Sequence, residues 1–110
     1  MSAHRAQEIV EQATSWPGVP AHDHRFGGIE FRVDNRQLGD LHRDRTADIP
    51  LKRALRDELI AKGRARPHRW RPDSGWVTVD IASDEGTEEA VRLLGIGYDN
   101  ALRARKRRTA

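Results

Sequence analysis

Histidine and acidic side chains gather in the N-terminal half of the sequence, where their spacing would suit metal binding or proton transfer. The stretch AHDHRFGGIEFR holds His22 and His24, which would project from the same side of an extended strand, about 7 Å apart. With His42 they could offer three imidazoles to Zn²⁺. Because His-x-His is a common pattern and polar residues also line the solvated face of a sheet, we favour a solvated face over a metal site.

A general acid–base pair is the second chemistry that these residues allow. An imidazole titrates near neutral pH and transfers protons when a carboxylate orients it. Either His24 or His42 could act in this way, although structural hydrogen bonds would account for the same residues without catalysis. The carboxylates in question are Glu30, Asp40, Asp44 and Asp48.

Ser74 is a third candidate, because it stands in a PDSGW segment where a nucleophile could be exposed on a turn. A serine nucleophile on a sharp strand-to-helix turn is normally framed as G-x-S-x-G, and this segment lacks that frame. A hairpin turn therefore explains Ser74 better than catalysis does.

Positive charge is concentrated in two segments that contain no acidic residue, within a chain of 20 basic and 17 acidic residues. The first, KGRARPHRWR, would form an edge strand with a tryptophan suited to stacking, and could hold an anion or nucleic acid. Charges on an edge strand also protect it from aggregation, so a solvated strand stays open as the alternative. The residues in question are Lys62, Arg64, Arg66, His68, Arg69, Trp70 and Arg71, and, in the second segment, Arg105, Lys106, Arg107 and Arg108.

The composition is that of one polar domain. The 110 residues are enough for a single modest core, and the mean hydropathy is -0.82. The absence of cysteine excludes disulfides and thiolate metal sites, and it fits a reducing compartment. We find neither a signal peptide nor an apolar run of about 20 residues, so we expect a cytoplasmic protein with no membrane association.

Periodicity predicts three helices and about five strands. Helical spacing of apolar residues marks the helices, and strict alternation in IEFRV and WVTVDI marks two of the strands. Pro50 suits the first turn of the second helix, and Asp48 would cap it. The helices are expected over residues 3–15, 50–62 and 83–102, and the strands over 19–24, 29–33, 37–42, 65–70 and 76–81.

The order of these elements, α-β-β-β-α-β-β-α, predicts an α+β fold. Hairpins without βαβ crossovers favour an antiparallel sheet with the helices packed on one face. Leu38 and Leu41 would fall on opposite faces of an ideal strand, so a bulge near Gly39 is expected. We expect one domain over residues 1–102, followed by a basic C-terminal tail over 103–110.

Several segments, taken in this order, carry a family resemblance: SWPGV, HRFGGIEFR, LGDLH, ADIP, RDELIAKGRARPH, PDSGW and a terminal LL with a later Tyr. From Trp16 to Leu102 they resemble the small bacterial luciferase-domain proteins, a family of unknown function. In that family the second strand ends Leu-Gly-His-Leu-His-Gly, whereas here Asp40 and Arg43 replace the first His and the last Gly. More distantly, the element order is similar to that of the MmcQ/YjbR proteins, which implies a CyaY-like fold and a role in DNA binding.

Two functions from different classes stay open. The first, which we favour at this point, is a non-enzymatic binding module whose two basic segments face nucleic acid or an anionic small molecule. The second is a small enzyme or ligand-binding protein with a polar pocket at the positions that the family resemblance indicates. The sequence indicates no cofactor. The pocket would consist of His24, Arg25, Glu30, His42, Asp48, Ser74 and Trp76.

Overall fold

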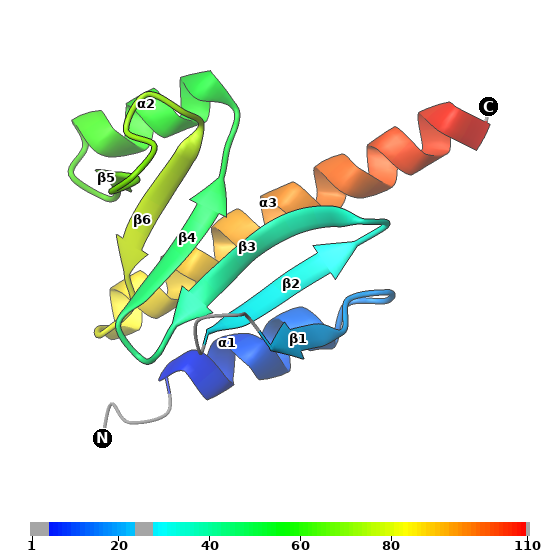
Figure 1. Ribbon diagram of the computed structural model, residues 1–110, viewed down its shortest axis with the longest axis horizontal. Helices are drawn as coiled ribbons and strands as arrows, with labels where there is room; N and C mark the ends of the chain where they lie inside the picture. The colour runs from blue at the N-terminus through cyan, green and yellow to red at the C-terminus, as the bar shows by residue number, and fades with distance from the viewer. Residues whose placement is uncertain (1–4, 24–27, 110) are drawn as a thin grey trace.

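A computed structural model describes residues 5–23 and 28–109 and, of residues 21–23, only the backbone. Within these ranges the chain forms three helices and a six-stranded antiparallel sheet with the strand order β1-β2-β3-β4-β6-β5 (Figure 1). The helices are α1 (Arg5–Thr14), α2 (Arg53–Ala61) and α3 (Asp84–Thr109). The strands are β1 (Ala21–Asp23), β2 (Ile29–Val33), β3 (Arg36–His42), β4 (Thr46–Pro50), β5 (Arg66–Pro67) and β6 (Trp76–Asp80).

The predicted α+β fold with an antiparallel sheet is confirmed, and the sheet contains one strand more than expected. That strand is β4, in the segment where Asp48 and Pro50 suggested the start of a helix. Helix α2 begins only at Arg53, and its N-cap residue Lys52 makes no side-chain capping bond. Because β4 pairs with β3 on one side and with β6 on the other, tertiary pairing overrides the local helix signal.

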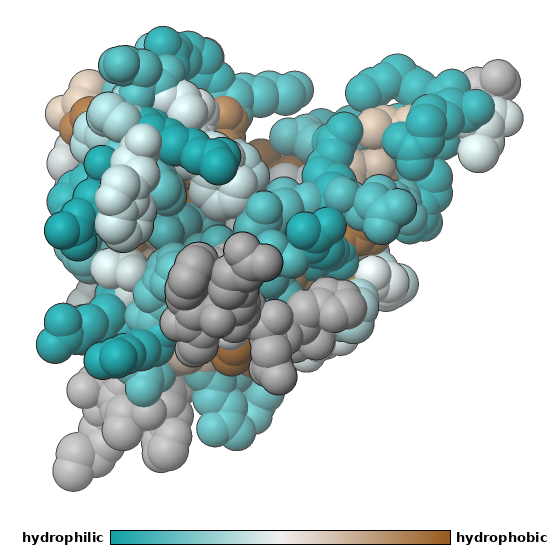
Figure 2. Space-filling view, in the orientation of Figure 1, coloured by the Kyte–Doolittle hydropathy of each residue, from teal (hydrophilic) through white to brown (hydrophobic). Residues whose placement is uncertain are grey.

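The sheet has one covered face and one open face. Helix α3 lies against β3, β4 and β6 and packs on α1, and in Figure 1 it runs behind the strands. Because side chains alternate along a strand, Ala47 and Ile49 of β4 and Val77 and Val79 of β6 are all buried on the side of α3. The residues between them, such as Asp48, point to the open face. Figure 2, drawn from the side of that face, is dominated by hydrophilic residues.

The bulge predicted near Gly39 is present in β3. Phe31 of β2 pairs with Gly39 while the next residue, Arg32, pairs with Gln37, so Leu38 is the additional residue. Gly39 has a φ of +155°, and a Cβ there would lie 2.8 Å from a methyl group of Leu94 in α3. The bulge lets Leu38 reach the core and sets the residues that follow it in register with β4.

Helix α3 is long for so small a protein. Its 26 residues span about 39 Å, and its C-terminal part stands clear of the sheet in Figure 1. Residues 103–109, which the sequence suggested as a tail, continue this helix. None of the helices in the described ranges is both long and apolar enough to cross a membrane.

Candidate metal centre

One row of cross-strand partner residues crosses the whole sheet and passes through Asp40 of β3. Backbone pairing places residues that are far apart in the sequence directly beside one another, and all six of them are polar. Since partners in an antiparallel ladder share a face, a polar row of this kind follows the open face from edge to edge. The row reads His22, Glu30, Asp40, Asp48, Thr78 and Arg66 from β1 to β5.

At the centre of this row, two carboxylates converge on one imidazole. Nε2 of His42 lies 3.0 Å from Oδ1 of Asp40 and 3.0 Å from Oδ2 of Asp48. The two aspartate side chains are only 10% and 11% exposed, whereas the His42 side chain is 39% exposed. The cluster is therefore fixed at its base by the sheet and accessible from above through His42.

Each carboxylate is oriented by a neutral donor on its other oxygen. The amide of Gln37 donates to Oδ2 of Asp40 over 3.3 Å, and the hydroxyl of Thr78 donates to Oδ1 of Asp48 over 2.6 Å. These bonds leave Oδ1 of Asp40 and Oδ2 of Asp48 turned toward His42. In protein metal sites, hydrogen-bond donors that contact the ligand residues and not the ion fix the orientation of those residues.

His68 approaches the cluster from the segment between β5 and β6. Its Nδ1 accepts the backbone N–H of Trp70 over 3.2 Å, which places the proton of a neutral imidazole on Nε2. That Nε2 lies 3.6 Å from Oδ2 of Asp48, and the ring meets Trp76 edge-on with the ring centroids 6.0 Å apart. His68 thus turns Nε2 toward Asp48 at slightly more than hydrogen-bond distance and extends the polar cluster toward Trp70 and Trp76.

The donor set of the cluster is suited to a divalent ion. One oxygen of Asp40, Nε2 of His42 and one oxygen of Asp48 lie within 4.8 Å of one another. One imidazole nitrogen with two carboxylate oxygens is a ligand combination found for Zn²⁺, Mn²⁺ and Fe²⁺. A proton-transfer role for His42 is the other chemistry that the same contacts allow.

The other site residues predicted in the N-terminal half of the chain have three different outcomes. His24 and Arg25 lie outside the described residues, as does the side chain of His22, so the three-histidine metal site and part of the predicted pocket stay predictions. Glu30 belongs to the polar row but accepts a hydrogen bond from Arg32 on its own strand. Asp44 accepts the backbone N–H of Ala6 at the start of α1 over 2.9 Å, away from the cluster.

Ser74 is held inside the turn that precedes β6. Its hydroxyl donates to the carbonyl of Arg71 over 2.6 Å and accepts the backbone N–H of Trp76 over 3.1 Å. This is the pattern of a serine that stabilises a turn. The hydroxyl is thereby engaged on both its donor and its acceptor side, as the turn interpretation from the sequence expects.

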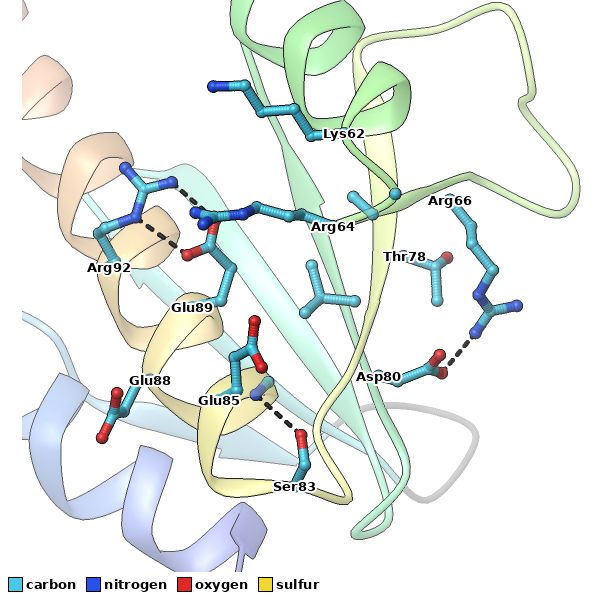
Figure 3. Close-up of a pocket in the computed structure, with 14 residues that line it drawn as sticks. Lys62, Arg64, Arg66, Thr78, Asp80, Ser83, Glu85, Glu88, Glu89 and Arg92 are labelled. Atoms are coloured by element: carbon cyan, nitrogen blue, oxygen red, sulfur yellow. Dashed lines mark hydrogen bonds and ion pairs between the residues drawn. The ribbon is translucent and has the colours of Figure 1, made fainter.

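The strand in the first basic segment is shorter than the sequence predicts, and one of its cations is engaged in an ion pair. Only Arg66 and Pro67 form the strand, and Arg66 pairs with Asp80 at 2.6 Å. Beside it lies a hollow of about 580 Å³, in which Arg92 forms an ion pair with Glu89 and lowers the pKa of that carboxyl (Figure 3). The charged residues around this hollow are of both signs: Lys62, Arg64, Arg66 and Arg92 against Asp80, Glu85, Glu88 and Glu89.

The two basic segments do not lie together. In Figure 1, β5 and the end of α3 are toward opposite ends of a molecule whose longest dimension is 45 Å. A nucleic-acid surface that combines both segments, as predicted from the sequence, would have to bridge that length. Binding of nucleic acid by either basic segment alone therefore stays a prediction.

Fold and site together define a small α+β protein with an Asp–His–Asp cluster on the open face of its sheet. The family model described as "Luciferase domain" matches residues 35–97, which is more than half of the chain, so the chain belongs to the luciferase-domain family. Asp40, His42, Asp48 and Thr78 all lie in the matched part. No curated protein and no solved structure matches the chain, and the resemblance to MmcQ/YjbR proteins stays a prediction.

Proposed function

We propose that this protein binds a divalent transition-metal ion on the open face of its sheet, and that the ion is the centre at which it binds a ligand. The observation that carries the proposal is the convergence of Asp40, His42 and Asp48, whose ligand atoms lie within 4.8 Å of one another. Gln37 and Thr78 support it, since they hold both carboxylates in the converging orientation.

The ligand set favours Zn²⁺, Mn²⁺ or Fe²⁺ over Ca²⁺ and Mg²⁺. Calcium takes six to eight oxygen ligands, and magnesium is bound through oxygen with several retained waters. An imidazole nitrogen among three ligands suits the transition metals. Three protein ligands also leave coordination positions for water or for a bound molecule, as in catalytic zinc sites.

The arrangement of His42 supports ion binding over acid–base catalysis. In a histidine–carboxylate pair that transfers protons, the carboxylate holds one ring nitrogen while the other nitrogen faces the substrate. Here two carboxylates, of Asp40 and Asp48, face the same nitrogen, Nε2, so three potential ligand atoms lie within 4.8 Å of one another, an arrangement that a proton-transfer pair does not need. The family name refers to luciferase activity, but the cluster supports ion binding and points to no particular reaction, so we propose no oxidation step.

Calorimetric titration of the chelator-treated full chain tests the proposal directly. With Zn²⁺, Mn²⁺, Mg²⁺ and Ca²⁺ as separate titrants, we expect one transition-metal ion per chain and much weaker binding of the other two. Asp48→Asn removes a ligand charge and should weaken the affinity at least 100-fold.

Asp99→Asn is the matched control, because it makes the same charge change at an exposed position of α3. It should leave the affinity unchanged. Absence of a saturable heat with all four ions, or equal affinities for the Asp48→Asn variant and the parent protein, would refute ion binding at this cluster.

A further inference from the structure

The C-terminal part of α3 has an inner and an outer side. Ala101 is buried, and Arg105 donates two hydrogen bonds, of 2.7 and 2.8 Å, to the carboxylate of Asp34 at the tip of the β2–β3 hairpin. Arg108 reaches the same carboxylate at 3.7 Å. These residues recur at helical spacing, so the side of α3 that carries them faces the body of the protein.

Three further cations project from the opposite side. Arg103, Lys106 and Arg107 are spaced i, i+3 and i+4 and therefore form one stripe along the helix surface. All three are exposed, and Arg103 makes one bond of 3.3 Å, to the side chain of Asn100. Residues 103–110 contain no acidic residue. The inner cations are thus engaged by Asp34, whereas the outer stripe faces solvent where the end of α3 extends beyond the strands (Figure 1).

We propose that this outer stripe of Arg103, Lys106 and Arg107 binds the phosphates of double-stranded DNA. Arginine guanidinium groups match phosphate geometry, and the outer side of an α-helix can approach the major groove of B-DNA, which is wide enough to admit a helix. The proposal is independent of the metal ion, which would bind on the open face of the sheet.

The structure favours duplex DNA over two other anionic partners. A helix that lies on a membrane needs an apolar face opposite its charges, but the face opposite this stripe packs on the β2–β3 hairpin through Arg105 and Arg108. Proteins that bind single strands stack bases on aromatic side chains. The last aromatic residue of the chain is Tyr98, whose hydroxyl donates to the carbonyl of Pro17 over 2.8 Å.

Fluorescence anisotropy with a labelled 20-base-pair duplex, measured over a series of salt concentrations, tests the proposal. Replacement of the stripe by R103Q, K106Q and R107Q together should weaken binding at least tenfold at about 50 mM salt. It should also reduce the slope of log Kobs against log salt by about three, one for each phosphate that a side chain of the stripe neutralises in the parent protein. The metal-binding variant Asp48→Asn should bind DNA as the parent protein does.

The matched control is the triple substitution R64Q, R69Q and R71Q, which removes the same charge at the other end of the molecule. It should lower DNA affinity less than threefold. Equal losses of affinity in the two triple variants would show a general charge effect and overturn the assignment to α3. No binding of the parent protein to the duplex at low salt, or binding only to anionic phosphatidylserine vesicles, would also overturn it.

Discussion

Asp40 and Asp48 are direct cross-strand partners on β3 and β4, and both of their carboxylates turn toward Nε2 of His42. Like charges directly opposite each other in an antiparallel ladder destabilise a sheet. Two nearly buried aspartates at one such pair are therefore not explained by stability of the fold. They are explained if the pair holds an ion, because natural sequences break local rules of stability mainly at functional sites.

The first prediction concerns the stability of Asp48→Asn in the presence of a chelator. The amide oxygen can still accept the hydroxyl of Thr78, while the repulsion from Asp40 is relieved. The contacts of Oδ2 with His42 and His68 are lost in this variant, and this loss opposes the relief of repulsion, so we expect the free energy of unfolding to change by less than about 1 kcal/mol. Urea unfolding followed by circular dichroism measures it, and a loss of more than about 1 kcal/mol would show that Asp48 serves the fold.

The second prediction tests whether metal affinity depends on the orientation of the Asp48 carboxylate, with Asp48 itself left in place. Thr78→Val keeps the shape and the strand preference of the residue but removes the hydroxyl that donates to Asp48. Affinity for the transition-metal ion should fall about 10- to 100-fold, as expected for loss of an outer-shell partner. Thr46→Val, on the same face in β4, is the matched control and should change the affinity less than threefold. Equal effects of the two changes in calorimetry would count against a positioning role for Thr78.

The third prediction compares Gly39, where a Cβ would clash with its neighbours, with Gly97, where a Cβ can be accommodated. At Gly39 a Cβ would lie 2.8 Å from both the carbonyl oxygen of Asp48 and a methyl group of Leu94, so Gly39→Ala should destabilise the protein by about 2–4 kcal/mol. Gly97 lies within α3, where a Cβ would meet only Leu38, at 3.6 Å. Gly97→Ala should stabilise the protein by about 0.5–1 kcal/mol. Chemical denaturation measures both, and the same sign for the two variants would contradict this packing of β3 against α3.

Local signals in the sequence predicted much of the sheet. Alternation in Ile29–Val33 and Trp76–Asp80 identified β2 and β6 and the faces of their side chains. Asp34 and Asn35, which are residue types that tolerate positive φ in tight hairpin turns, adopt φ values of 51° and 64° between β2 and β3. The bulge at Gly39 followed from the positions of two leucines that both had to reach the core.

The centre of the candidate site depends on long-range pairing that no local pattern contains. Asp48 and Pro50 are also residues typical of a helix start, so β4 is distinguished only by its pairing with β3 and β6. Without that strand, Asp40 and Asp48 cannot be placed opposite each other. His68 was expected on a strand, but β5 is only two residues long and ends at Pro67, which has no N–H to continue the ladder. Thr78 could have been identified from its position between Val77 and Val79, because a residue between two core residues of a strand points to the opposite face of the sheet.

The last prediction concerns the clamp between Asp34 and Arg105, which holds the inner side of α3 to the β2–β3 hairpin. Hydrogen bonding from Arg105 lowers the pKa of Asp34 below its ordinary value of 3.8. Asp34 therefore favours the docked helix above pH 3.8, and this contribution is lost as the pH falls through its lowered folded-state pKa. In NMR relaxation measurements, the backbone of residues 103–109 should become more mobile when the pH is lowered from about 5 to about 3.

Asp34→Asn should produce the mobile state already at pH 5 and make it independent of pH in that range. Asp84→Asn is the matched control, because Asp84 also pairs with an arginine, Arg5, but at the opposite end of α3. It should leave residues 103–109 as ordered as in the parent protein. Since both groups are exposed, added salt should weaken the effect of Asp34. Equal order of residues 103–109 in Asp34→Asn and in the parent protein at pH 5 would show that the clamp does not hold the helix end, and that the intrinsic helix preference of the C-terminal segment is sufficient.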